Sequence, residues 1–336
     1  MPKIDYKAAG VDVEAGDSLV DWLTSQKKSS TPWDNRVRSG IGGFASLFDI
    51  SFPEMKNPQL ITCTDGVGTK VQVASYFQDF STVGQDLVSM CVNDLLCSGG
   101  VPLQFLDYYA TGKLNLNHAK EFLGGVRRAC DEVQCILIGG ETAEMPGVYQ
   151  NDDFDCAGFA VGIVDRDKMW GAHRVQVGDC LIGLSSSGFH SNGFSLLRKV
   201  FAADLDQYRQ WLLEPTRLYF KAVQKVGDLD IRAAANITGG GIYNIPRVIP
   251  QDMAVVLNLW TFPEPFLEVQ RRSGLSFLEM VSTLNCGLGF VLIVPPEQAS
   301  LVHERLREIG QETWDLGVVV QNTPQIQEQI SWSKEV

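Results

Sequence analysis

Residues 138–147 read Ile-Gly-Gly-Glu-Thr-Ala-Glu-Met-Pro-Gly, and they directly follow a short apolar run at 135–138. Paired glycines let the backbone turn sharply or pass close to a ligand, because no Cβ stands in the way. Glu141 and Glu144 come just after the glycines, so their carboxylates are expected to face whatever fills that space. Taken alone, the stretch is equally well explained as a tight turn with solvated acids.

The same combination of apolar run, glycine and acid recurs along the chain. Residues 65–70, Asp-Gly-Val-Gly-Thr-Lys, follow the apolar run 60–63, and three glycines at 239–241 follow the run 233–237. A further acidic pattern, Val-Asn-Asp-Leu at 92–95, lies in a helix-like stretch. Strand ends that repeatedly carry glycine and acid favour a site for a metal-bound phosphate.

Length and composition narrow the class of protein. The 336 residues exceed the size that one core usually serves, so two domains are expected. No apolar run approaches the ~18 residues that span a bilayer, and the first residues lack a signal-peptide pattern, so we expect a cytoplasmic protein with no membrane association. The 8 cysteines include no Cys-x-x-Cys pair, which argues against a zinc site. A net charge of -12 disfavours nucleic acid as a partner but allows a nucleotide held through a divalent cation.

Alternating apolar periodicities predict an α+β or α/β architecture. A polar segment at 165–168 lies near the middle and predicts a boundary between domains 1–166 and 167–336. The strand-like runs are 60–64, 103–109, 135–138, 156–164, 180–184, 233–237, 254–259, 289–294 and 313–320. The helix-like runs are 82–98, 116–132, 192–202, 215–226 and 296–309.

The helix-like run 82–98 carries unusual polar residues. Asp86 and Asn93 are seven residues apart and share one helix face, with Asp94 beside it. The many apolar neighbours leave little solvent face, so the helix is expected to be buried, and buried carboxylates are normally paired or bound to a metal. A helix whose polar side chains simply face water remains the alternative.

A second polar element, residues 185–193, reads Ser-Ser-Ser-Gly-Phe-His-Ser-Asn-Gly and joins a strand-like run to a helix-like run. Hydroxyls and glycines at a helix N-terminus form an anion site from free N–H groups. Capping of the helix by Ser191 or Asn192 is the plainer interpretation, and both can hold. His190 lies in this loop and is as well explained by a surface position as by a function. The sequence contains no Walker A loop, Rossmann fingerprint or nucleophile elbow.

With these motifs, the chain resembles the phosphoribosylformylglycinamidine cyclo-ligases, the aminoimidazole ribonucleotide synthetases of purine biosynthesis. The glycine and acid elements are shared with a wider ATP-binding superfamily that includes thiamine-phosphate kinase and selenophosphate synthetase, whereas 106–113 and 188–193 look particular to the cyclo-ligases. The matching segments are 6–12, 42–44, 64–70, 83–86, 92–95, 105–113, 139–147, 186–195, 215–217, 238–241, 245–248 and 285–287.

The resemblance implies a two-domain α+β fold. The N-terminal domain would join its copy in a second subunit to form a dimeric β-barrel, and the C-terminal domain would be a layered α/β structure. The four N-terminal strand-like runs are indeed too few to close a barrel alone. The implied reaction is the ATP- and Mg²⁺-dependent ring closure of formylglycinamidine ribonucleotide to aminoimidazole ribonucleotide, with release of ADP and phosphate, by a homodimer.

The motif matches also predict roles for single residues. Asp65, Asp94 and Glu141 are the predicted metal ligands, and His190 is the predicted catalytic acid–base, since a histidine pKa lies near working pH. Lys70 would contact phosphate or be merely a charge on a helix face. The other predicted ATP- and phosphate-binding residues are Gly42, Gly43, Gly66, Gly68, Gly139, Gly140, Ser187, Gly188, Asn192, Gly239, Gly240 and Gly241.

Three segments depart from the family pattern. Ala45 stands where the family has glycine, the run 239–247 is one residue shorter and lacks a glutamate, and 281–284 lacks an arginine. Three functions therefore stay open: the active cyclo-ligase, a non-catalytic nucleotide-binding relative, and another ATP-using member of the superfamily such as a small-molecule kinase.

Overall fold

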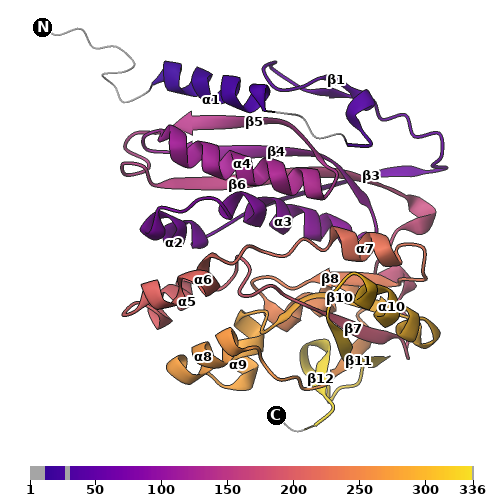
Figure 1. The fold of residues 1–336 in the computed structure, drawn as a ribbon. Helices are drawn as coiled ribbons and strands as arrows, with labels where there is room; N and C mark the ends of the chain where they lie inside the picture. The colour runs from indigo at the N-terminus through magenta and orange to yellow at the C-terminus, as the bar shows by residue number, and fades with distance from the viewer. Residues whose placement is uncertain (1–11, 27–30, 335–336) are drawn as a thin grey trace, which may run out of the picture.

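The computed structural model describes residues 12–26 and 31–334. Two large β-sheets, one from each half of the chain, lie one above the other with helices between them (Figure 1). The last strand of the first sheet ends at Asp165 and the first strand of the second begins at Cys180. No helix in the described ranges is both long and apolar enough to cross a membrane.

The first sheet has four strands in the order β3-β6-β4-β5. β6 is antiparallel to both β3 and β4, whereas β4 and β5 are parallel and are joined through the crossover helix α4 (Leu116–Glu132). β3 and β5 are therefore the two edges of the sheet. The strands are β3 (Pro58–Gly66), β4 (Val101–Thr111), β5 (Ile136–Glu144) and β6 (Phe154–Asp165).

The second sheet has six strands in the order β12-β9-β11-β7-β10-β8 and is antiparallel except for the β12–β9 pair. Its strands are β7 (Cys180–Ser185), β8 (Ala233–Asn236), β9 (Met253–Leu257), β10 (Leu288–Val294), β11 (Thr313–Gln321) and β12 (Ile330–Trp332). A small two-stranded sheet pairs β1 (Val37–Ser39) with β2 (Leu47–Phe48). The other helices are α1 (Val13–Ser25), α2 (Lys70–Phe77), α3 (Val83–Leu96), α5 (Phe194–Val200), α6 (Arg209–Leu213), α7 (Phe220–Val226), α8 (Glu264–Ser273), α9 (Phe277–Thr283) and α10 (Pro296–Glu308).

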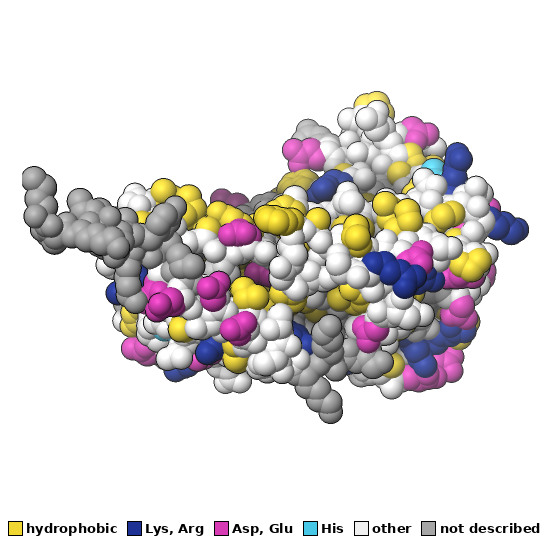
Figure 2. All heavy atoms as spheres, turned by 90° about the horizontal axis from the view of Figure 1, so that it is seen from above, with side chains coloured by type: hydrophobic (Ala, Val, Ile, Leu, Met, Phe, Trp, Pro, Cys, Tyr) yellow, Lys and Arg dark blue, Asp and Glu magenta, His cyan; other side chains and the backbone are white. Residues whose placement is uncertain are grey.

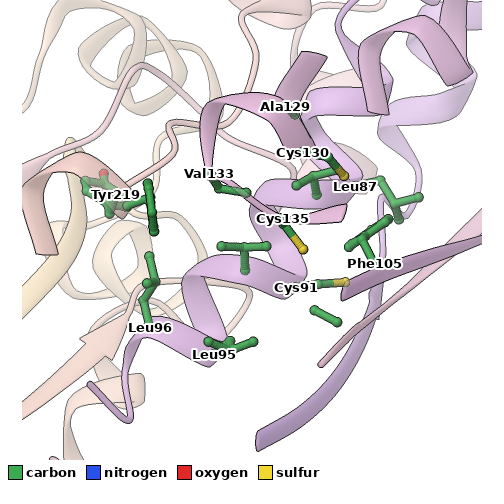
Figure 3. Packing of buried hydrophobic residues seen from close by; sticks show 14 of the residues in the cluster. Leu87, Cys91, Leu95, Leu96, Phe105, Ala129, Cys130, Val133, Cys135 and Tyr219 are labelled. Atoms are coloured by element: carbon green, nitrogen blue, oxygen red, sulfur yellow. The ribbon is translucent and has the colours of Figure 1, made fainter. Parts of the chain in front are cut away.

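Helix α3 is the centre of the core. Its apolar side chains pack against the first sheet and α4, and Tyr219 from the C-terminal half reaches the same cluster (Figure 3). Gly84 allows the close approach of α3 and α4, because a Cβ there would clash with the backbone oxygen of Phe122. The burial predicted for this helix is confirmed, since Asp86 and Asn93 are both fully buried.

The two faces of the first sheet differ. Helices α3 and α4 pack against one face, whereas on the other Leu60 is 58% exposed and Phe159 is 44% exposed. Seen from above, hydrophobic side chains are spread across the molecule's width (Figure 2). The described chain thus forms an open sheet with apolar residues on its free face, and it stays a prediction that a second subunit closes this sheet into a barrel.

Two predicted elements differ from the structure. The strand predicted to stop at Ile138 continues to Glu144, so the glycine–acid segment belongs to an edge strand rather than to a turn. The helix predicted over 215–226 begins only at Phe220, because the carbonyls of Thr216 and Arg217 accept hydrogen bonds from Ser89 and Asn93 of α3.

Candidate functional site

Two of the predicted metal ligands meet where the halves of the chain join. Asp65 lies at the end of β3 and Asp94 in the last turns of α3. Burial raises the pKa of both carboxyls, and the charge of Asp94 raises the pKa of Asp65 further. Asn236 donates to Asp94 at 2.8 Å, and the charge of Arg247 partly offsets the effect of burial. Two neighbouring half-buried acids with an amide beside them suit a hard divalent cation, which takes oxygen ligands.

Predicted phosphate-binding residues surround this pair. Gly66 and Gly68 form the turn from β3 to α2, where Gly68 has a positive φ of 67°, and Thr69 beside them contacts Ser195 at 3.2 Å. Asn192 lies against Gly239, since a Cβ at that glycine would be 3.3 Å from the Asn192 Oδ1 atom. We call the group Asp65, Gly66, Gly68, Asp94, Asn192 and Gly239 the junction cluster.

Gly240 and Gly241 continue from the junction cluster into a 3₁₀ segment, Gly241–Val248. Gly241 has a positive φ of 53°, and a Cβ there would clash with the backbone oxygen of Val281, so only glycine fits. Ser187 and Gly188 are held in place instead: the Ser187 hydroxyl donates to the Pro215 carbonyl at 2.6 Å, and Asn285 donates to the Gly188 carbonyl at 2.9 Å.

Glu141 does not join Asp65 and Asp94 within the chain. The strand register places Glu141 of β5 opposite Tyr108 of β4. Tyr108 lies opposite Ala157 of β6, and Ala157 lies opposite Gly66 of β3. Three interstrand spacings, roughly 14 Å, therefore separate its strand from β3. No group of three potential metal-binding side chains occurs among the described residues. Within one chain Glu141 therefore lies apart from Asp65 and Asp94, because β3 and β5 are opposite edges of the sheet, and the assignment of all three acids as metal ligands stays a prediction.

The remaining predicted glycines lie with Glu141. Gly139 and Gly140 precede it on β5, and the connection that contains Gly42 and Gly43 runs alongside, where the Ser46 hydroxyl donates to the Ile138 carbonyl at 2.7 Å. We call Gly42, Gly43, Gly139, Gly140 and Glu141 the β5 cluster. Glu144 belongs to neither cluster, because its carboxylate accepts from the backbone N–H of Leu114 at 2.7 Å and from that of Asp12.

Lys70 is fully buried and ion-paired. Its Nζ lies 2.8 Å from the carboxylate of Asp86 and donates to the Glu214 carbonyl at 2.7 Å. Asp86 also accepts from the backbone N–H and the hydroxyl of Thr216, both at 2.7 Å. This arrangement, the Lys70 latch, ties the N-terminal half to the segment before α7. In this conformation Lys70 is neither an exposed helix-face charge nor open to a phosphate, because its partners come from the protein.

His190 is buried as well, with 2% of its surface exposed and a left-handed φ of 59°. Burial lowers the pKa of its ring to about 3, and the charges of Lys70 and Arg217 add to the effect. Its Nε2 atom accepts from the backbone N–H of Ser187 at 3.3 Å. In this state the neutral His190 ring holds the loop 185–193 in place through its hydrogen bond with Ser187. A role of His190 in proton transfer stays a prediction.

Sequence reasoning missed Asp107 as a candidate. It lies in the apolar strand β4, is 5% exposed, and burial raises its carboxyl pKa to about 7. A signal for this acid is present in the sequence, since Asp107 is the one charged residue within the apolar run 103–109.

Family models match both halves of this arrangement. The AIR synthase related protein N-terminal domain matches residues 45–164, and the corresponding C-terminal domain matches 176–327. The chain belongs to the AIR synthase-related proteins. The junction cluster draws residues from both of these domains.

Solved structures share the AIR synthase-related fold at low sequence identity. Thiamine-monophosphate kinase from Stenotrophomonas maltophilia K279a is 16% identical over 96% of each chain, with a TM-score of 0.63. E. coli HypE, a hydrogenase maturation protein, is 16% identical over 96% of this chain and 94% of its own, with a TM-score of 0.67. A HypE structure in complex with ATP is 16% identical over 87% of this chain and 84% of that one, with a TM-score of 0.64. At this identity the likeness establishes the fold.

Proposed function

We propose that this protein is an enzyme that binds Mg²⁺–ATP at the junction cluster and transfers the γ-phosphoryl group to an oxygen of a small substrate. The observation that carries the proposal is the pairing of Asp65 and Asp94, whose pKa values are raised by burial and, for Asp65, by the neighbouring charge. A fold relative that was solved in complex with ATP supports the choice of nucleotide. Bound Mg²⁺ would neutralise the phosphate charge there, and the glycine turns would offer backbone N–H groups.

Among possible substrates, formylglycinamidine ribonucleotide is the one we propose. Residues 106–113 and 188–193 resemble segments that look particular to the cyclo-ligases, whereas the glycine and acid motifs are common to the superfamily. Phosphorylation of the formyl amide oxygen would create a leaving group, and attack by the amidine nitrogen would then close the imidazole ring and release phosphate. A kinase of the same superfamily is the second candidate, supported by the shared fold of thiamine-monophosphate kinase.

Product analysis separates these functions. Ring closure yields ADP and free phosphate in equal amounts, because the phosphoryl group leaves the substrate again. A kinase acting on thiamine monophosphate yields ADP without free phosphate, and a non-catalytic relative yields neither. We expect ADP and phosphate from formylglycinamidine ribonucleotide, with about a hundredfold or greater loss in Asp65→Asn and Asp94→Asn. Asp315→Asn, which changes an 80% exposed carboxylate on β11, is the matched control. Full turnover by both junction variants at limiting Mg²⁺ would refute the assignment.

We further propose that a second copy completes the site. A twofold axis along the barrel would pair the β5 edge of one protomer with the β3 edge of the other, and so bring the β5 cluster to the partner's junction cluster. β3 and β5 run in the same direction, and Asp65 and Glu141 both lie toward their C-terminal ends. The exposed Leu60 and Phe159 would be covered in the closed barrel.

Subunit mixing tests this arrangement. Asp65→Asn and Glu141→Gln are each expected to be inactive, but a mixed dimer of the two has one site with both native acids. Random mixing should therefore restore about a quarter of the parent activity. If both acids act within one chain, every site in the mixture is defective and no activity returns. Light scattering at sub-micromolar concentration gives a second test, because a fully active monomer contradicts the shared site.

A further inference from the structure

The loop that carries His190 is bound to the segment before α7 on both sides of that histidine. The Ser187 hydroxyl donates to the Pro215 carbonyl at 2.6 Å, and the Ser191 hydroxyl lies 2.9 Å from the hydroxyl of Thr216. Thr216 is 2% exposed and Ser191 is 7% exposed, so water does not compete for the contact between them. His190 is therefore fixed between two hydrogen bonds to one short segment.

The hydroxyl of Thr216 has a defined direction. It donates to the Asp86 carboxylate at 2.7 Å, and this carboxylate is ion-paired with Lys70 at 2.8 Å, so it can only accept. A hydroxyl carries a single hydrogen, so Thr216 must accept from the Ser191 hydroxyl. Because Asp86 belongs to α3, these two consecutive hydrogen bonds fix the loop relative to that helix.

The backbone of His190 requires this support. Its φ of 59° is left-handed, and a residue with a Cβ keeps such a strained conformation only where its surroundings enforce it, often at functional sites. Gly289 leaves room for the ring, since a Cβ there would clash with both the His190 ring and the Tyr219 hydroxyl. Gly289 and Tyr219 thus shape the space for the ring, whereas the hydrogen bonds on either side of His190 hold its backbone.

The helix that supports the loop also carries an acid of the junction cluster. Asp94 lies in the last turns of α3, and the residue that follows Ser191 in the chain is Asn192 of the same cluster. Thr216 therefore stands between the predicted metal ligand and the loop. Reaction rates depend on the placement of groups to within about 1 Å, so a bond that sets this spacing matters for more than stability.

We propose that Thr216 is a positioning residue whose hydroxyl, by joining Ser191 to Asp86, holds His190 at a fixed place relative to the junction cluster during the reaction. The inference rests on the proposed function, with His190 as the acid–base of that reaction. Because Thr216 is buried, it acts through His190 and not on a ligand directly. A hydroxyl with a purely structural role would instead lower the stability of the fold without slowing the folded enzyme.

Removal of the hydroxyl alone tests this role. Thr216→Val keeps the shape of the side chain and should lower kcat about tenfold or more, while the KM for ATP changes by no more than a few-fold. Thr216→Ser keeps the hydroxyl and should stay within a few-fold of the parent. Thr323→Val, at an exposed threonine after β11, is the matched control and should be fully active. Urea titration verifies that each variant is folded under the assay conditions.

A double-mutant cycle shows whether Thr216 acts through His190. His190→Ala should lower kcat by ~10²–10⁴-fold, as expected for loss of an acid–base group. Thr216→Val should slow that variant no further, because the side chain that Thr216 positions is already absent. The proposal is overturned if Thr216→Val slows the parent and the His190→Ala variant by the same factor. It is also overturned if the kcat of folded Thr216→Val equals that of the parent, or if Thr216→Ser is as slow as Thr216→Val.

Failure of the proposed function gives a separate result. If the parent releases no ADP with either formylglycinamidine ribonucleotide or thiamine monophosphate, the proposed function and this inference both fail. If the parent is active and His190→Ala stays within a few-fold of it, the function stands and the positioning role is refuted. If Thr216→Val does not fold, Ser191→Ala removes the same bond from the side of the loop and takes its place in both tests.

Discussion

Asp86 and Asp107 are both buried aspartates of the N-terminal half, but their surroundings differ. Asp86 is fully buried, pairs with Lys70 at 2.8 Å and accepts two hydrogen bonds from Thr216 at 2.7 Å. Asp107 is 5% exposed and has only its own N–H as a partner within the described chain. A carboxylate that the protein itself pairs holds parts of the fold together, whereas one left unpaired is available to a ligand. Burial alone therefore does not identify a functional acid. The hydrogen-bond and ion-pair partners of the buried acid distinguish a structural role from a functional one.

The largest effect is expected at the Lys70 latch. Lys70→Met removes one partner of a fully buried ion pair and leaves the Asp86 charge without its counter-ion. We expect a loss of about 3–5 kcal/mol in the free energy of unfolding, measured by urea titration. The double variant Lys70→Met/Asp86→Leu should recover most of that loss, because no charge stays unpaired. A double variant as unstable as the single one would show that Asp86 acts chiefly through Thr216.

At Asp107 we expect a substitution to raise the stability of the fold rather than lower it. Because burial raises its pKa from 3.8 to about 7, the folded chain holds a proton that the unfolded chain releases over this range. Stability is therefore lost as pH rises from about 4 to 7 and is level above that. Asp107→Asn should be more stable than the parent by up to about 3 kcal/mol near pH 8, and by much less near pH 5. Asp315→Asn, at an exposed site, should show no such gain, and a gain independent of pH would refute this explanation.

His190, near the Lys70 latch, is expected to cause a smaller loss of stability, and this loss occurs at acid pH. Its pKa is lowered from 6.5 to about 3, so the unfolded chain takes up a proton below pH 6.5 that the folded chain refuses. The contribution of the neutral His190 ring to stability is complete above pH 6.5 and is lost as pH falls toward 3. The loss reaches about 2 kcal/mol at pH 5. His190→Gln cannot be protonated and should lose less stability between pH 7 and 5 than the parent. The exposed His173→Gln is the control, and an unchanged slope in His190→Gln would mean that the ring is not buried in solution.

The sequence predicted the regular framework better than the site. Every strand-like run lies on a strand of the structure, because apolar periodicity records burial directly, and α4 has the predicted limits Leu116–Glu132. Helices α1, α2, α6, α8 and α9 were not predicted: α8 combines charged residues with few apolar ones, and α2, α6 and α9 are short. The local pattern predicts a helix at 215–219. The segment is not helical because its backbone bonds to α3 instead, as in the hydrogen bond from Asn93 to the Arg217 carbonyl, and such tertiary bonds cannot be predicted from the local pattern.

The candidate site was predicted residue by residue but not as an arrangement. Glycine and burial mark Asp65 and Asp94 locally as candidate metal ligands, and the fold brings their charges close enough to interact. The separation of Glu141 depends on the strand order β3-β6-β4-β5, which one sequence does not specify. The alternative in which Lys70 is a charge on a solvent-facing helix surface is wrong, because Lys70 is buried against Asp86, a partner 16 residues away that is recognised only in the fold. A phosphate contact of Lys70 stays a prediction.

The smallest effect is expected at Ala45, in the connection beside the β5 cluster. Its φ is not among the positive values of the described residues, so alanine adopts an ordinary conformation at a position where the cyclo-ligase pattern that the sequence resembles has glycine. Ala45→Gly should therefore change only the entropy of the unfolded chain and lower stability by no more than about 1 kcal/mol, with turnover unchanged or slightly higher. Gly241→Ala is the contrasting variant, because its Cβ would clash with the Val281 backbone and its φ is 53°. Urea titration and ADP release measure both variants. A large loss of activity in Ala45→Gly would show that the connection is built around the alanine side chain, and the β5 cluster would then require a rigid approach to the nucleotide.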